Sequence, residues 1–148
     1  MTEIDDKLIA ALLDKASANP RLRQNYDLRT ICDDTSQRML NALMPGTQVP
    51  IHRHEETSET VVCISGMLDE VIYRLVPLAA AEEGPVMPRG MDAQDVTRPR
   101  MGFVEERRIR LCPAEGKYGC QVPKGAWHTV EVLEPSVIFE AKDGKYVG

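Results

Sequence analysis

The sequence lacks the features that would place a protein in a membrane, outside the cell or on a nucleic acid. No hydrophobic run approaches the roughly 20 residues that cross a bilayer, and the N-terminus has neither the basic start nor the apolar stretch of a signal peptide. Basic residues are also scarce, because 18 Lys and Arg stand against 23 Asp and Glu, which gives a net charge of −5. We therefore expect a cytoplasmic protein with no membrane partner and no nucleic-acid partner.

Several redox and catalytic motifs are absent as well. The four cysteines form no Cys-x-x-Cys pair, which favours reduced thiols over a disulfide framework. The chain also has no Gly-x-Ser-x-Gly elbow, no glycine-rich phosphate loop and no paired carboxylates. These absences argue against serine-esterase, kinase and glycosidase chemistry.

The 148 residues, 43% hydrophobic and 28% charged, are enough for one globular domain with one core. Residues 3–18 carry an apolar stripe at helical spacing behind a Thr2–Asp5 capping box, and this pattern predicts a helix. Residues 20–35 are charged and polar without a clear period, and predict an extended connector. We therefore assign residues 1–36 to an N-terminal helix and connector.

From Arg38 onward the pattern changes to short apolar or alternating runs separated by Gly, Pro and Asp, which indicates an all-β domain in residues 37–148. Many short strands of this kind close most easily as a sandwich or a jelly-roll barrel. Residues 77–106 hold four of the ten prolines and show no sustained period, so they predict a loop inserted between two strands. The predicted strands are 38–43, 60–64, 69–76, 107–112, 120–122, 128–133 and 137–142.

All three histidines of the chain lie in two short motifs. His52 and His54 are separated by one residue, so on an extended segment both imidazoles lie on one face. Glu59 begins the next predicted strand, and His128 follows a Pro-x-Gly turn at the start of a later one. Imidazole and carboxylate donors from adjacent strands predict a site for one divalent transition metal, which is Zn, Ni, Fe, Mn or Co. Three imidazoles and one carboxylate leave coordination positions open for a small molecule.

The spacing of these residues resembles the cupin superfamily, whose first motif is G(X)5HXH(X)3,4E(X)6G. The core of the second cupin motif is also present, although its leading Gly position holds Lys117 and its final Asn position holds Val132. The resemblance implies a single cupin jelly-roll β-barrel with one bound metal. The residues that match the two motifs are Gly46, His52, His54, Glu59, Gly66, Pro123, Gly125 and His128.

A narrower resemblance is to the WbuC-type cupins, which are often encoded beside O-antigen biosynthesis genes. It covers most of the chain except residues 77–106, and implies an N-terminal helix on the barrel and a link to polysaccharide biosynthesis. Many cupins pair, so the resemblance also implies a homodimer. The segments that carry it are 17–23, Asn25-Tyr26, 37–43 with Pro45-Gly46-Thr47, 127–130 and 139–146.

Two functions remain open. In the first, the protein is a metal-dependent enzyme that acts on a small, carbohydrate-related molecule by isomerase-like or other proton-transfer chemistry. In the second, it is a non-catalytic, metal-dependent ligand-binding or sensing module; a metal that only stabilises the barrel is a third interpretation.

Several side chains near these motifs are candidates for supporting roles. Asn41 and Cys63 are expected to face the predicted metal ligands from neighbouring strands. Glu140 and Lys142 share a strand face and are expected to form an exposed ion pair of little energetic worth. The residues that can contact an anionic substrate are Arg21, Arg23 and Tyr26.

Overall fold

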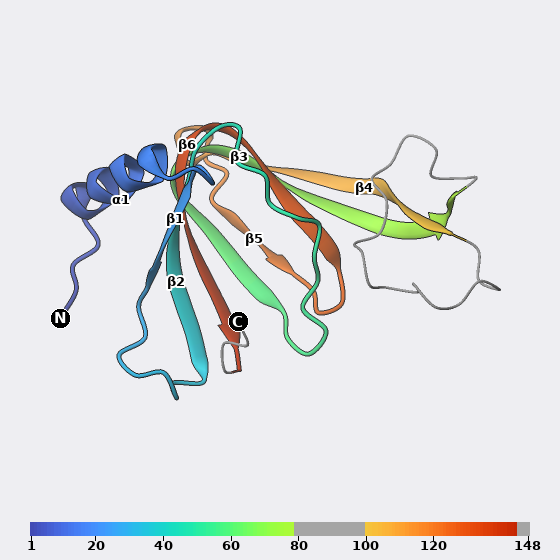
Figure 1. Cartoon of the computed structure of the whole chain (residues 1–148), viewed down its shortest axis with the longest axis horizontal. Helices are drawn as coiled ribbons and strands as arrows, with labels where there is room; N and C mark the ends of the chain where they lie inside the picture. The colour runs from blue at the N-terminus through green and yellow to red at the C-terminus, as the bar shows by residue number, and fades with distance from the viewer. Residues whose placement is uncertain (79–99, 145–148) are drawn as a thin grey trace.

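The computed structural model describes residues 1–78 and 100–144. In this part of the chain one α-helix precedes six strands that form a single rolled sheet (Figure 1). None of the described helical residues forms a segment with the length and hydrophobicity that crossing a bilayer requires. The elements are α1 (Asp6–Ala18), β1 (Arg23–Asp27), β2 (Ser36–Leu43), β3 (Glu59–Pro77), β4 (Met101–Leu111), the 3-10 helix η2 (Pro113–Glu115), β5 (Gly119–Val122) and β6 (Trp127–Asp143).

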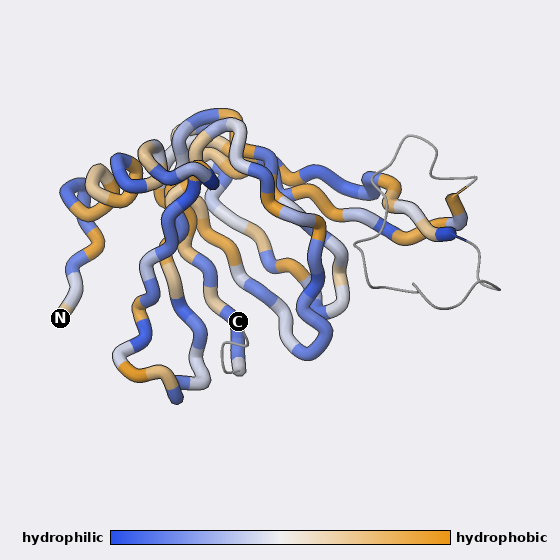
Figure 2. The backbone as a smooth tube through the Cα atoms, in the orientation of Figure 1, coloured by the Kyte–Doolittle hydropathy of each residue, from blue (hydrophilic) through white to orange (hydrophobic). Residues whose placement is uncertain are grey.

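All strand pairs are antiparallel. Five strands follow the order β1-β2-β6-β3-β4, and β5 pairs with the first residues of β3. Polar and apolar residues alternate along much of the strands, as expected when one face of a sheet is enclosed (Figure 2). One end of the barrel interior is an apolar core of Leu43, Val61, Cys63, Leu68, Leu111 and Ile138.

Helix α1 covers the outer face of β1, β2 and β6. Leu12 and Ala16 are buried in a second core with residues of these strands, including Leu40 and Val137. The predicted helix start at residue 3 was early, because Asp5 is itself the N-cap and its carboxylate accepts a hydrogen bond from the Leu8 amide at 2.9 Å. The expected Thr2–Asp5 capping box is therefore wrong.

The predicted connector of residues 20–35 contains the strand β1. Its five residues pair with β2 from Arg23 opposite Leu43 to Asp27 opposite Met39. The strand lies at the edge of the sheet and four of its five residues are polar or charged, so its sequence shows no apolar alternation. This explains why the pattern alone predicted no strand there.

In two places, two strands that were predicted to be separate are joined into one long strand, β3 and β6. Ser65-Gly66 and Glu134-Pro135 were expected to end strands, but both lie within shifted register where β3 pairs with β6. Gly66 has φ of +96°, and a Cβ there would lie 2.3 Å from the Pro135 carbonyl oxygen. The turn-forming residues thus make a bulge that bends two paired strands, and residues on both sides of the bend pack into one core.

Both ends of the predicted inserted loop belong to strands. Residues 101–106, expected to be loop, are the first part of β4, and Pro77 still belongs to β3. The Leu78 amide donates to the Arg100 carbonyl at 2.7 Å, so β3 and β4 form a two-stranded arm that extends beyond the other strands (Figure 1). The rest of the prediction, for residues 79–99, lies outside the described residues.

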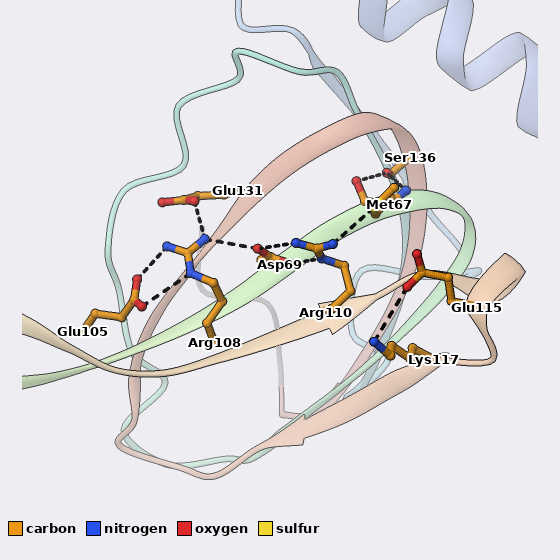
Figure 3. A network of polar contacts seen from close by, with 9 residues as sticks. All are labelled: Met67, Asp69, Glu105, Arg108, Arg110, Glu115, Lys117, Glu131 and Ser136. Atoms are coloured by element: carbon orange, nitrogen blue, oxygen red, sulfur yellow. Dashed lines mark hydrogen bonds and ion pairs between the residues drawn. The ribbon is translucent and has the colours of Figure 1, made fainter.

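A polar network ties β3, β4 and β6 together on the face opposite the barrel interior (Figure 3). Asp69 is buried beneath the guanidinium groups of Arg108 and Arg110, which both form ion pairs with it. Arg108 also pairs with Glu105, at 2.6 Å, and with Glu131. These arginines are therefore occupied outside the barrel and do not face the site described next.

Candidate metal centre

The structure brings the three histidines together. His52 lies outside the strands, but its backbone pairs with that of His128 at the start of β6, with N···O distances of 3.0 and 2.8 Å. His54 follows on the same segment, and its carbonyl oxygen accepts a hydrogen bond from the Gly125 amide at an N···O distance of 2.7 Å. The three imidazoles offer ligand atoms that all lie within 4.8 Å of one another. The cluster predicted from the two motifs thus forms at one place in the fold.

Two of these imidazoles are oriented by backbone carbonyl groups. Nδ1 of His52 lies 2.9 Å from the Pro50 oxygen, and Nδ1 of His128 lies 2.8 Å from the Ala126 oxygen. A carbonyl only accepts, so each Nδ1 carries the proton and each Nε2 keeps its lone pair. The buried Nε2 of His128 has no hydrogen-bond partner among the described residues. This arrangement fits a metal ligand, whose second nitrogen is commonly held in this way.

Burial also favours the unprotonated form of His52 and His128. It lowers the pKa of His52, and together with the neighbouring His52 it lowers the pKa of His128 to about 4. Neutral imidazole is the form that binds a metal ion. His52 and His128 are therefore in the form that binds a metal ion at neutral pH.

Glu59 contacts one member of the histidine cluster, His54. Its Oε2 lies 2.9 Å from Nε2 of His54, and the residue is only 5% exposed. Burial by itself raises the pKa of Glu59, but the hydrogen bond with His54 opposes burial and the pKa lies below its usual value. Glu59 is not part of the three-histidine group that the donor distances define among the described residues. Its role as a fourth ligand stays a prediction.

Two residues expected at the surface face the barrel interior instead. Glu140 pairs across strands with Val61, and Lys142 pairs with Glu59, and both of these β3 residues are buried on the inner face. The Lys142 ammonium lies 3.3 Å from Nδ1 of His54, to which it can donate. The predicted exposed ion pair of Glu140 and Lys142 is therefore wrong. The prediction failed because the sheet is rolled, and the face of β6 that carries these two residues is the face that Val61 lines inside the barrel.

Glu70 adds a third carboxyl group to the interior. It is 1% exposed, and its Oε2 has no hydrogen-bond partner in the described part of the chain. Burial, with Glu59 and Glu140 nearby, raises the pKa of Glu70 to about 9. Burial and Glu59 likewise raise the pKa of Glu140 to about 7, although Lys142 opposes the shift. The expectation of no paired carboxylates fails, because three of them influence one another inside the barrel.

The two residues predicted to support the metal ligands have other contacts. Asn41 faces inward opposite Ile138, and its side chain hydrogen-bonds Glu140, which lowers the pKa of that carboxyl. The Cys63 thiol donates to the Ser65 carbonyl at 3.3 Å, and burial raises its pKa to about 11. Asn41 therefore acts on Glu140, and Cys63 is a small buried core residue.

The predicted anion contacts are divided between two places. Arg21 and Arg23 line a small polar cavity of about 150 Å³ at the edge of the sheet, and Arg23 donates to the Gln48 carbonyl at 2.7 Å. Tyr26 packs instead in the core beneath α1. The three residues therefore do not form one site, because neighbouring residues of a strand point to opposite faces.

Comparisons with known proteins show similarity in fold. A family model described as a domain of unknown function (DUF6016) matches residues 4–76, and no curated protein sequence matches the chain. KdgF from Halomonas sp. is 15% identical over 87% of this chain and 84% of its own, with a TM-score of 0.53. TT1209 from Thermus thermophilus is 18% identical over 97% of this chain and 98% of its own, with a TM-score of 0.53. A cupin-2 domain containing protein from Shewanella frigidimarina is 16% identical over 88% and 89%, with a TM-score of 0.48.

The chain has the cupin jelly-roll fold that its two motifs predicted, with one helix at the N-terminus. Both motifs deliver their histidines to one cluster at the barrel interior. The molecule is therefore a cupin-fold protein whose histidine cluster can hold a metal ion. The identity of the ion is open, because mixed imidazole and carboxylate donors suit several divalent transition metals.

Proposed function

We propose that this protein is a metal-dependent enzyme that acts on a small, carbohydrate-related molecule. His52, His54 and His128, joined by Glu59, would hold one divalent transition metal. The observation that carries the proposal is the orientation of His52 and His128, whose Nδ1 atoms donate to carbonyl groups and leave the lone pair on each Nε2; that of His128 is buried without a partner among the described residues. A divalent ion bound there would supply a Lewis acid that polarises an oxygen of a bound molecule.

Isomerase-like or other proton-transfer chemistry is favoured by the carboxyl groups beside the cluster. With a pKa of about 7, Glu140 can both give and take a proton near neutral pH. Glu70, with a pKa of about 9, keeps its proton under the same conditions and can donate a hydrogen bond. The interior thus offers a proton acceptor and a proton donor within one enclosed space. A WbuC-type role in polysaccharide biosynthesis is consistent with this chemistry and rests on the sequence resemblance.

A non-catalytic binding or sensing module is the second candidate. Val132, which stands where the second cupin motif has a polar residue, packs against the apolar core and offers no group to a reaction. The two candidates differ in one measurement. An enzyme that moves a proton next to a carbonyl group should incorporate deuterium from D₂O into an aldose or ketose, observed by NMR. A binding module should release heat on titration with such a sugar and leave its protons in place.

Metal binding itself is tested by elemental analysis of protein purified without a metal-affinity tag. We expect about one transition-metal ion per chain, a loss of most of it in His128→Ala, and a reduced content in Glu59→Ala. Glu55→Ala is the matched control, because Glu55 is exposed in the same segment and pairs with Arg53. Wild-type protein that carries no ion after growth in metal-supplemented medium, or a His128→Ala protein that keeps its ion, would contradict the proposal.

A further inference from the structure

The inner faces of β4, β3 and β6 line up in cross-strand rows. Arg107 of β4 lies opposite Ile72 of β3, which lies opposite His128 of β6. The next row, one step further along the strands, contains Ile109 and Glu70. Residues in one row of a sheet point to the same side, so Arg107 faces the same interior as the histidine cluster.

A cavity of about 400 Å³ lies against these rows. Ile72, Ile109 and Val122 form much of its wall, and Arg107 and Gln121 supply polar groups. The cavity adjoins the histidine cluster, because Val122 lies opposite Glu59 and the lining residue Ala126 is the one whose carbonyl accepts from His128. A molecule held here is therefore beside the candidate metal ligands.

Arg107 differs from the neighbouring arginines of the same strand. Arg108 and Arg110 point to the opposite face, where both form ion pairs with Asp69. Arg107 is exposed and forms no ion pair or hydrogen bond with the residues that the structure describes, although its charge acts on the Cys120 thiol together with the charges of Glu70 and Glu59. A guanidinium without a partner on a cavity wall is available to a ligand.

We propose that Arg107 anchors the carboxylate of a small organic acid in this cavity. A guanidinium binds a carboxylate through two parallel hydrogen bonds, and the apolar wall suits the carbon skeleton of such an acid. A phosphate ester is less well suited. Glu106 on the cavity wall would repel its second negative charge, and the described lining residues include no Lys or Arg besides Arg107. The proposal rests on the proposed function, whose substrate it narrows to carboxylates.

Mandelate is a suitable probe, because it combines a carboxylate with a hydroxyl group and an apolar ring, and mandelamide is its neutral counterpart. Isothermal titration into metal-loaded protein should show mandelate binding at least about tenfold more tightly than mandelamide, as expected for a hydrogen-bonded charge pair. In Arg107→Met this preference should disappear, whereas Arg107→Lys should keep part of it. Arg74→Met, which removes an exposed arginine of β3, is the matched control and should bind as the wild type does.

Metal content and the urea unfolding midpoint are measured on every variant, so that loss of the ion or of the fold is separated from loss of the anchor. Equal mandelate affinity in wild type and Arg107→Met would overturn the proposal while leaving the metal site intact. No mandelate binding by the wild type up to the solubility limit, or tighter binding of inorganic phosphate than of mandelate, would also overturn it. Failure of the proposed function would be recognised separately, by protein that holds no metal at all.

Discussion

At the scale of single residues, Glu70 is the most unusual group of the barrel. Its carboxyl is buried, its Oε2 lacks a hydrogen-bond partner in the described chain, and its pKa is raised to about 9 by burial and by Glu59 and Glu140. An unfolded chain releases this proton at a much lower pH. The folded state therefore loses stability as the pH rises between the unfolded and folded pKa values of this group.

Replacing Glu70 by Gln removes this titration. In chelator-treated protein we expect Glu70→Gln to gain stability relative to the wild type as the pH is raised from 5 to 8, by up to about 4 kcal/mol. Urea denaturation at several pH values measures the difference. Glu56→Gln, at an exposed position, should show no such trend. A stability difference that stays constant with pH would mean that Glu70 ionises normally.

At the scale of elements, the bend shared by β3 and β6 decides the shape of the barrel. Ser136 connects the two strands at this point, because its hydroxyl accepts from the Met67 amide at 3.0 Å. Gly66 lies against the same part of β6 and leaves room for its backbone. The bulge is therefore a packing feature that depends on a residue without a side chain.

Gly66→Ala should destabilise the fold strongly. The new Cβ would meet the Pro135 oxygen at 2.3 Å, so we expect a loss of about 3 kcal/mol. Gly125 is the matched control: it also has a positive φ, of +81°, but a Cβ added there would meet nothing within 4 Å. Gly125→Ala should cost only about 1 kcal/mol for its backbone conformation. Equal losses in urea denaturation would show that close approach of β6 is unimportant.

At the scale of the whole molecule, the histidine cluster joins segments that are far apart in the chain. The segment with His52 and His54 is held against the start of β6 by backbone hydrogen bonds and by the Thr129 hydroxyl, which donates to the Val49 carbonyl at 2.6 Å. A bound ion would add a further connection between these segments in the folded state only. Pairing of two copies into a homodimer stays a prediction, which light scattering can check.

Removing the metal should therefore lower the melting temperature. With free metal at about 1,000 times its dissociation constant, binding adds about 4 kcal/mol to the free energy of unfolding. Loss of this contribution corresponds to a fall in the melting temperature of roughly 10 °C for a chain of this size. Differential scanning calorimetry with and without chelator measures the shift. His128→Ala protein should melt at the same temperature in both conditions. An unchanged wild-type transition would argue against binding linked to folding.

Much of the metal site could be predicted because its residues obey short-range rules. His52 and His54 share a face through the period of two, and His128 begins a strand after a Pro-x-Gly turn. The carboxyl groups were missed for a different reason. Glu70 lies between Leu68 and Ile72 at the spacing of an inward face, but only the pairing with β4 and β6 shows that this face is enclosed. A charged residue within an alternating run is otherwise interpreted as exposed.

The sequence by itself determined the fold class, the helix and the histidine pattern, because hydrophobic period and motif spacing are properties of neighbouring residues. Only the tertiary structure decided which side chains surround the cluster. Edge strands, bulges and enclosed faces depend on which strands pair, and β6 became an interior strand only by pairing with both β2 and β3. In the rolled sheet Glu140 and Lys142 face inward, and the pairing of β3 with both β4 and β6 sets Arg107 in the row of His128, because burial belongs to the assembled sheet and not to any one segment.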